Sequence, residues 1–312
     1  MKILLTGASG FLGRNFILRA PEHWEILAVY RNDTGFPEFL SALGRENIRA
    51  ARCDLADAEQ TSALVQQYGS EWECCLYLSA KVDIPWSTRE PRNDLLLNAC
   101  PLLNLLDSIQ AQRLIYFSSG AVYDGLRGQV SADSNIAPTL PYAISKLACE
   151  RYVEFYHQRR KSVEAFLNVR FFGAYGPYEA AHKIYTRLVR AFALEGQTGY
   201  TIYGDGRNLI DAMYVDDAID VIQRMLTGNY WNATIDLASG HPVTIEELVR
   251  QAAAALGVSA LQLEKSGVAH ENIEFRVSTE ALKTHYGFEP RVPLSAGILQ
   301  LRDFLVREQA GQ

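Results

Sequence analysis

The first thirteen residues, MKILLTGASGFLG, restrict the possible folds of this chain more than any other segment. Lys2–Leu5 is a short apolar run typical of a buried strand, and it is followed directly by Gly7, Gly10 and Gly13 at the start of a predicted helix, Phe11–Arg19. The glycines allow a tight turn and a close backbone approach, and a helix N-terminus attracts phosphate. An ordinary strand-to-helix turn is the alternative. The turn predicts a dinucleotide-binding site formed by Gly7, Ser9, Gly10, Phe11, Leu12 and Gly13.

Short apolar runs continue to alternate with longer amphipathic stretches. Further strands are expected at Glu25–Tyr30, Cys74–Leu78, Leu114–Ser118 and Val163–Arg170. This alternation predicts an α/β fold, a Rossmann-type doubly wound parallel sheet with helices on both faces. Ligands of such sheets bind at the carboxyl ends of the strands, so functional residues should follow strands directly.

Beyond about residue 172 the alternation becomes less regular. Helices are expected near His182–Glu195, Ile245–Leu256 and Leu294–Val306, and a strand at Ala233–Leu237. We therefore expect a dinucleotide-binding domain at 1–172, to which part of 207–240 returns. A smaller C-terminal α/β substrate lobe is expected at 173–206 and 241–312.

Composition argues against several classes of partner. The net charge of −6 lacks the basic excess that nucleic-acid binding needs, and no apolar run is long enough for a membrane span. Six scattered histidines and five cysteines without paired ligand spacing predict no metal site. The absence of an export signal and the odd number of cysteines predict reduced thiols and a cytoplasmic location.

The end of the second predicted strand bears on cofactor choice. Tyr30 cannot supply the carboxylate that accepts hydrogen bonds from an adenosine ribose, whereas Arg31 could pair with a 2′-phosphate. NADP is therefore favoured over NAD, although Asp33 keeps NAD open and Arg31 could be a solvated loop charge. Asp54, with Leu55 after it, is expected either near the adenine or as a helix N-cap.

The pair Tyr142 and Lys146 places a phenol and an ammonium one helical turn apart. A nearby cation lowers the pKa of a phenol, so Tyr142 could take or return the proton of a carbinol. Such pairs also decorate solvated helix faces. Ser119 follows the predicted strand Leu114–Ser118 and is expected to orient a substrate oxygen toward Tyr142.

With these residues in place, the chain resembles the extended short-chain dehydrogenase/reductase family, in particular its nucleotide-sugar epimerase/dehydratase group. The matching segments are Thr6–Gly13, Asp54-Leu55, Leu78-Ser79-Ala80, Asn98, Ser118–Tyr123, Tyr142–Lys146 with Glu150, Arg170–Pro177 and Tyr214–Asp217. The resemblance implies that Ser119 orients substrate, that Tyr142 is the acid/base, and that Lys146 lowers its pKa and holds the nicotinamide ribose. It also implies that Leu78, Ser79, Ala80, Lys81 and Asn98 contact the cofactor and that Ser87 contacts the substrate.

The chain departs from the family pattern at three places. Gly173 stands where the family has Asn, and Ile210 stands where it has an Arg that serves the diphosphate. Either nearby cations replace that Arg or the ligand is not a standard nucleotide sugar. Gly120-Ala121 replaces the Asp-Glu pair of the dehydratases, which disfavours dehydration. The expected substrate contacts are Ser87, Ser119, Gly120, Gly173, Lys183, Arg187 and Arg207.

These observations predict NAD(P)-dependent hydride transfer at a ring carbinol or ketone of a nucleotide sugar, by an epimerase or a ketoreductase. The alternatives are a reductase of a non-nucleotide ketone and a cofactor-binding protein without catalysis. The resemblance also implies a homodimer formed through the helix of Tyr142 and the long helix before it. Six leucines on that long helix could serve either the interface or the core: Leu95, Leu96, Leu102, Leu103, Leu105 and Leu106.

Overall fold

The computed structural model describes residues 1–267 and 273–310. The chain divides into two compact units. Unit 1 comprises Met1–Gly125, Asn135–Phe171 and Gln223–Ile235. Unit 2 comprises Leu126–Ser134, Phe172–Ile222 and Asp236–Gln312.

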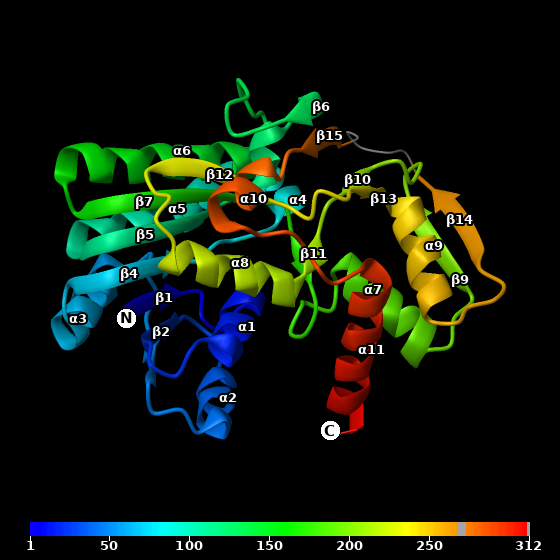
Figure 1. Cartoon of the computed structure of the whole chain (residues 1–312), viewed down its shortest axis with the longest axis horizontal. Coiled ribbons are helices and arrows are strands. Elements are labelled where there is room, and N and C mark those ends of the chain that lie inside the picture. Colours follow the sequence, from blue (N-terminus) through cyan, green and yellow to red (C-terminus); the bar gives the residue numbers. More distant parts are fainter. Residues whose placement is uncertain (268–272, 311–312) are drawn as a thin grey trace. The chain divides into compact units, whose positions relative to one another are not determined.

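A seven-stranded sheet, in the order β12-β7-β5-β4-β1-β2-β3, forms the centre of unit 1 (Figure 1). The six strands from β7 to β3 pair with their neighbours in parallel. The predicted strands and the Rossmann-type fold class are thereby confirmed. The strands are β1 (Lys2–Thr6), β2 (Glu25–Tyr30), β3 (Ile48–Arg52), β4 (Glu71–Tyr77), β5 (Gln110–Ser119), β7 (Val163–Phe171) and β12 (Ala233–Leu237).

Helices cover both faces of this sheet. On one face, α3 (Ala58–Tyr68), α5 (Pro91–Ser108) and α6 (Pro141–Phe155) contribute side chains to a single apolar cluster with the strands. The other face carries α1 (Phe11–Arg19), which has the predicted bounds, and the end of α8 (Val215–Thr227). Gln223 of α8 donates to the Arg19 carbonyl at 2.7 Å. The sheet is therefore doubly wound.

The central strands are apolar on both sides because both faces are covered. Cys74, Cys75 and Leu76 of β4 are completely buried, as are Leu114 and Ile115 of β5. All five cysteines are free thiols, as predicted. Shorter elements of unit 1 are α2 (Phe36–Leu43), α4 (Ile84–Arg89), the 3-10 turn η1 (Gly120–Tyr123) and the π-helical turn η2 (Tyr156–Arg160) that continues α6.

Unit 2 contains helices and two-stranded sheets. The sheets pair β15 (Glu274–Val277) with β6 (Arg127–Val130), β14 (Gln262–Ser266) with β9 (Gly199–Tyr203), β11 (Met213–Tyr214) with β8 (Ala174–Tyr175), and β10 (Leu209–Ile210) with β13 (Val243–Thr244). The helices are α7 (Ile184–Val189), its π-helical continuation η3 (Arg190–Leu194), α9 (Ile245–Ala255), α10 (Glu280–Tyr286) and α11 (Leu294–Ala310). The three helices predicted in this region are thus present.

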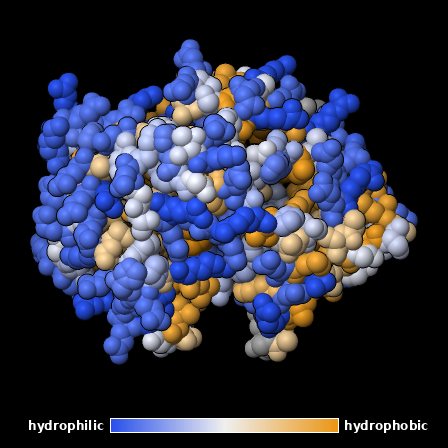
Figure 2. All heavy atoms as spheres, viewed as in Figure 1, coloured by the Kyte–Doolittle hydropathy of each residue, from blue (hydrophilic) through white to orange (hydrophobic). Residues whose placement is uncertain are grey.

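The face of the molecule drawn in Figure 2 is mostly hydrophilic, with hydrophobic atoms gathered in smaller patches. Within residues 1–267 and 273–310, no helix combines the length and apolarity needed to cross a membrane.

Candidate active site

The glycine turn after β1 leaves no room for side chains. Gly7 has φ +67°, and a Cβ there would lie 2.9 Å from the Ser79 amide nitrogen. A Cβ at Gly13 would lie 2.5 Å from the carbonyl oxygens of both Gly7 and Ala8. The Gly10 amide donates to the Gly7 carbonyl at 3.0 Å, which closes the turn. Glycine is therefore required at two of the three predicted positions, by conformation and by close approach.

The helix that leaves this turn begins without a side-chain cap. Gly10 is the N-cap of α1 and has no side chain that could accept from the first amides. Those amides point outward at the positive end of the helix dipole, an arrangement that binds phosphate. The turn and helix start therefore fit the pyrophosphate of a dinucleotide.

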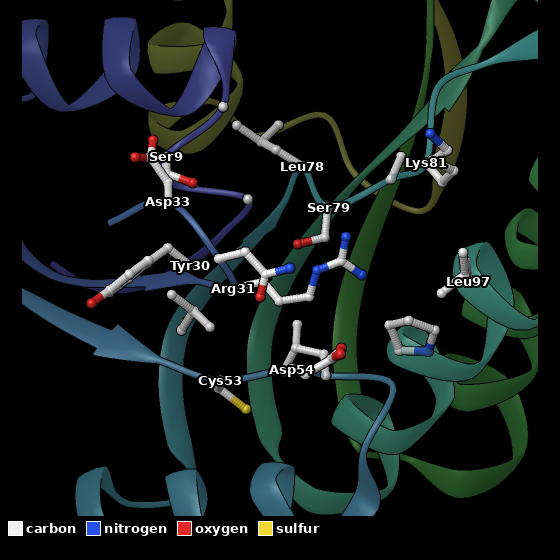
Figure 3. A pocket seen from close by; sticks show the side chains of 17 residues that line it. Ser9, Tyr30, Arg31, Asp33, Cys53, Asp54, Leu78, Ser79, Lys81 and Leu97 are labelled. Atoms are coloured by element: carbon white, nitrogen blue, oxygen red, sulfur yellow. The ribbon is translucent and has the colours of Figure 1, made fainter. Parts of the chain in front are cut away.

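A cavity of about 360 Å³ lies at the carboxyl ends of the strands, next to this turn (Figure 3). Ten predicted cofactor residues line it: Gly7, Ser9, Gly10, Arg31, Asp54, Leu55, Leu78, Ser79, Ala80 and Lys81. The other predicted cofactor residues, Phe11, Leu12, Gly13, Asn98, Tyr142 and Lys146, are not part of its lining. Tyr30 and Asp33, which the sequence raised for cofactor choice, also line it. Sequence reasoning missed five further lining residues: Val29, Asn32, Cys53, Leu97 and Pro101.

Two charged residues after β2 are held very differently. The Asp33 carboxylate accepts from Arg14 at 2.6 Å and from the Gly35 amide at 3.0 Å. The Arg14 guanidinium also lies 4.5 Å from the Phe39 ring centroid, so this pair is fixed on both sides. Arg31 is exposed, and its guanidinium has no hydrogen-bond partner in the described part of the chain. Figure 3 shows the Arg31 side chain extending over the cavity, whereas Asp33 lies beside Ser9.

Asp54 lines the cavity and does not cap the following helix. The N-cap of α3 is Asp57, which accepts from the amides of Glu59 at 2.9 Å and Gln60 at 3.1 Å. The Asp54 carboxylate instead accepts from the Ala56 amide at 3.1 Å. The N-cap alternative for Asp54 is therefore wrong.

Ser119, Tyr142 and Lys146 come together within unit 1. Ser119 ends β5, and its hydroxyl is close enough to the Tyr142 phenol to lower the pKa of that phenol. Tyr142 and Lys146 lie on α6 and are 4% and 2% exposed. The Lys146 ammonium donates to the Phe117 carbonyl at 2.6 Å and lies 4.8 Å from the Tyr116 ring centroid. Both groups are thus on a buried helix face, and the solvated-face alternative is wrong.

Burial shifts the pKa values of both groups toward their neutral forms. It raises the pKa of Tyr142 to about 12, although the nearby Ser119 hydroxyl acts in the opposite direction. It lowers the pKa of Lys146 to about 8, against the opposing effects of Cys149, Glu150 and Asp94. Proton transfer by Tyr142 at neutral pH therefore requires additional positive charge nearby, such as an oxidised nicotinamide ring.

Two buried polar networks support this helix. Glu150 of α6 accepts from the Arg170 guanidinium at 2.9 and 3.1 Å and from the Ser118 hydroxyl. Arg170 also donates to the Tyr123 phenol at 3.0 Å. In the second network Asp94 of α5 accepts from Ser145. Asp94 was missed from the sequence; its position four residues before Asn98, on the same helix face, was the available signal.

The remaining predicted contacts of unit 1 have structural partners. Asn98 accepts from the Lys81 amide at 3.0 Å, which fixes the backbone that lines the cavity. Ser87 is completely buried, and its hydroxyl donates to the Ile84 carbonyl at 2.7 Å. Gly120 is buried at the start of η1. The predicted substrate roles of Ser87 and Gly120 stay predictions.

The predicted substrate residues of unit 2 are mostly exposed. Lys183 and Arg187 are exposed, and the Arg187 guanidinium lies 5.8 Å from the Tyr200 ring centroid. The Arg207 side chain is 84% exposed and lies 3.9 Å from Asp205. Gly173 has φ +137°, a conformation that L side chains rarely adopt, so an Asn there would be strained. Among the described residues no cluster of potential metal ligands occurs.

The fold and this site define an α/β dinucleotide-binding protein with a half-buried Ser119 and a buried Tyr142 and Lys146 at the carboxyl edge of the sheet. The model of the NAD dependent epimerase/dehydratase family matches residues 3–233, and the chain belongs to that family.

The relatives of this chain include enzymes of two activities. The chain is 25% identical to dTDP-glucose 4,6-dehydratase of Streptomyces niveus over 96% of its length and 91% of the relative. It is also 25% identical to UDP-glucose 4-epimerase of Mycolicibacterium smegmatis, over 97% and 98% of the two chains. A solved structure of UDP-glucuronic acid 4-epimerase from Bacillus cereus, in complex with UDP-glucuronic acid and NAD, superposes with a TM-score of 0.86 at 22% identity. That match covers 99% of this chain and all of the other, and it shows the shared fold.

Proposed function

We propose that this protein transfers a hydride between NADP or NAD and a carbinol or ketone carbon of a nucleotide sugar, as an epimerase or a ketoreductase. The observation that carries the proposal is the convergence of the half-buried Ser119 with the buried Tyr142 and Lys146 within one site. A chain without catalysis has no physical reason to bury a lysine and a tyrosine beside each other, because burial disfavours both charged forms.

The roles follow from the contacts. Bound NADP or NAD supplies or accepts the hydride. Ser119 hydrogen-bonds the substrate oxygen and holds it near the phenol. Tyr142 takes the proton of the carbinol during oxidation and returns it during reduction. Lys146 lowers the pKa of Tyr142 through its positive charge and hydrogen-bonds the nicotinamide ribose.

Redox chemistry or epimerisation is favoured over dehydration. Elimination of water needs a proton donor and a base close to the reacting carbons. The residues after Ser119 are Gly120 and Ala121, neither of which can carry a proton. Sequence similarity alone does not distinguish epimerisation from dehydration, since a dehydratase and an epimerase are each 25% identical to this chain. The pair Gly120-Ala121 is therefore the basis of the preference.

NADP is proposed as the preferred cofactor. Arg31 extends over the cavity with its guanidinium unpaired within the described residues, and it can form a charge-assisted pair with a 2′-phosphate. Asp33, the carboxylate that would otherwise accept from ribose hydroxyls, is already engaged by Arg14. Tyr30 has no carboxylate at all.

A nucleotide sugar is proposed as the substrate, with Lys183, Arg187 and Arg207 as the cations that contact its diphosphate. Ile210 and Gly173 favour the second candidate, a reductase of a non-nucleotide ketone. The test is thermal unfolding of the cofactor-loaded protein with UDP, GDP, CDP or dTDP added singly. One nucleotide should raise the unfolding temperature by mass action. No rise with any of them would contradict the nucleotide-sugar proposal.

Whether the cofactor stays bound to the protein during purification distinguishes an epimerase from a ketoreductase. An epimerase uses the same nicotinamide twice within one turnover and should copurify with tightly bound cofactor, whereas a ketoreductase must exchange it. Mass spectrometry of the denatured protein measures the retained cofactor. If neither turnover nor cofactor reduction occurs with any sugar nucleotide or ketone while the cofactor still binds, the non-catalytic alternative holds.

A homodimer through α5 and α6 is also proposed. Leu102, Leu105 and Leu106 belong to the apolar core, and Leu103 packs against it. The apolar side chains of these helices that remain exposed are Leu95, Leu96, Ile144, Tyr152 and Phe155. Sedimentation velocity of wild type and Ile144→Asp tests this: wild type should sediment as a dimer and the variant as a monomer. A cytoplasmic location, supported by the free thiols, is tested by cell fractionation.

A further inference from the structure

Asp94 is a completely buried carboxylate outside the set of residues assigned above. It lies on α5, between the exposed Asn93 and Leu95. A carboxylate rarely loses all contact with water unless hydrogen bonds and an opposite charge compensate for its desolvation. The partners of Asp94 therefore indicate what it does.

One oxygen of Asp94 reaches the helix of the catalytic residues. The Ser145 hydroxyl donates to Oδ2 of Asp94 at 2.7 Å. Ser145 stands directly before Lys146 and three residues after Tyr142, so this bond restrains the turn of α6 that carries both groups.

The other oxygen reaches the backbone beside the cofactor cavity. The Asn98 side-chain amide donates to Oδ1 of Asp94 at 3.0 Å. The same amide group accepts from the Lys81 backbone nitrogen at 3.0 Å, and Lys81 lines the cavity. Asp94 thus joins the cavity wall to the Tyr142 turn through consecutive hydrogen bonds.

Three groups favour the charged form of Lys146, and Cys149 and Glu150 act on its pKa more strongly than Asp94 does. Burial raises the pKa of the Cys149 thiol. From α6, Lys146 is near Tyr142, Cys149 and Glu150; from β5 it is near Tyr116. Glu150 is already neutralised by the Arg170 guanidinium at 2.9 Å. At the edge of this region Lys81 pairs with Asp83 at 3.8 Å, and Arg89 of α4 is exposed. Asp94 interacts electrostatically with Lys146 without forming a direct ion pair in the described structure. Burial raises the pKa of Asp94, while the hydrogen bonds from Ser145 and Asn98 and the charge of Lys146 act in the opposite direction.

We propose that Asp94 is the positioning residue of the proton-transfer site: its ionised carboxylate fixes the Tyr142 turn through Ser145 and keeps Lys146 cationic. The proposal rests on the proposed function only in the roles that it gives to Tyr142 and Lys146. Removal of the Asp94 charge should make Lys146 lose its proton at lower pH.

NMR of protein labelled with ¹³C at the lysine side chains tests this without any substrate. The chain has seven lysines, and the Lys146 signal is assigned by its loss in Lys146→Met. In wild type this signal should titrate near pH 8. In Asp94→Asn, which keeps the size of the side chain and one acceptor oxygen, the midpoint should fall by roughly one pH unit.

Two controls separate charge from structure. Asp107→Asn removes a carboxylate from the same helix at a site bonded to Tyr156, and the Lys146 midpoint should stay at its wild-type value. Ser145→Ala removes the hydrogen bond but keeps the Asp94 charge. The Lys146 midpoint of this variant should therefore lie well above the Lys146 midpoint of Asp94→Asn. An unchanged Lys146 midpoint in folded Asp94→Asn would overturn the proposal.

A reciprocal measurement covers the case in which Asp94→Asn does not fold. With ¹³C at the aspartate carboxyls, loss of the counter-charge in Lys146→Met should raise the Asp94 midpoint by roughly one unit relative to wild type. Equal midpoints in the two proteins would overturn the proposal. Both titrations are independent of turnover, so absence of a substrate would contradict only the proposed function.

Discussion

The catalytic residues of unit 1 and the predicted substrate residues of unit 2 are held in opposite ways. Tyr142 and Lys146 are buried, and Asp94 and Glu150 fix their surroundings by hydrogen bonds. The cations Lys183, Arg187 and Arg207 project into solvent from unit 2, with only weak contacts to their neighbours.

This difference indicates which side chains must be positioned precisely. Proton and hydride transfer depend on geometry, so the groups that perform them are fixed by packing and by shared hydrogen bonds. Recognition of a diphosphate by exposed cations tolerates more movement and contributes less energy per residue, because solvent screens each pair. The comparison predicts large effects of substitution in unit 1 and small ones in unit 2.

The largest effect is expected for Tyr142→Phe. The substitution removes only the phenolic oxygen, so folding and NADPH affinity should change little. The turnover number should fall by about 10²- to 10⁴-fold, the usual contribution of a positioned proton-transfer group. Steady-state kinetics with the sugar nucleotide that stabilises the protein checks this. A turnover number within threefold of wild type would contradict the prediction that substitutions in unit 1 have large effects.

Arg31→Ala should have the next largest effect, on cofactor choice. Loss of a charge-assisted pair with the 2′-phosphate should raise the Kd of NADPH by about 10- to 100-fold. The Kd of NADH should stay within about twofold, since NADH lacks that phosphate. Fluorescence titration measures both constants. Arg49→Ala, an exposed arginine of β3 outside the cavity, is the matched control; an equal loss in both variants would contradict the role of Arg31.

A smaller effect is expected from pH. In the cofactor-free protein burial lowers the pKa of Lys146 to about 8. Below that pH the ammonium is charged and can hold the ribose and attract the phosphates; above it the charge is lost. NADPH affinity should therefore fall by up to about tenfold as the pH rises through about 8. The same titration of Lys146→Met should lack this step, and a step of equal size in that variant would assign it to another group.

The smallest effects are expected in unit 2. Lys183→Ala, Arg187→Ala and Arg207→Ala should each weaken binding of the stabilising nucleoside diphosphate by about two- to fivefold, as expected for exposed charge pairs. The effects should shrink further at high salt. Isothermal titration calorimetry measures them against Lys283→Ala, whose side chain pairs with Glu289. A hundredfold loss in any one variant would show that unit 2 also holds a fixed contact.

Local sequence signals predicted much of unit 1. The strands, the helix Phe11–Arg19 and the positions of Gly7 and Gly13 follow from apolar runs and glycine spacing, which act over a few residues. The pairing of β9 with β14 in unit 2 joins Gly199 to Gln262 and leaves no such local signal.

The polar partners in the site were harder to predict for the same reason. Ser145 and Asp94 are 51 residues apart, and Arg14 and Asp33 are 19 apart. Neither contact has a periodic pattern, because each depends on how helices and strands pack. The charge on Arg31 was visible in the sequence, but the engagement of Asp33 by Arg14, which leaves Arg31 as the available charge, was not.

The central claim is that the protein transfers a hydride between its substrate and a nicotinamide cofactor. Transfer of deuterium from the substrate to the cofactor tests this claim most directly. The cofactor-loaded protein is incubated with a nucleotide sugar that contains the nucleoside diphosphate found to stabilise the protein. The sugar carries deuterium at its carbinol carbon, and the nicotinamide is then analysed by mass spectrometry. Wild type should move the deuterium to the nicotinamide, while Tyr142→Phe with the same bound cofactor should not within the same time. Equal transfer by the two proteins, or none by wild type across the whole sugar-nucleotide panel, would contradict the account.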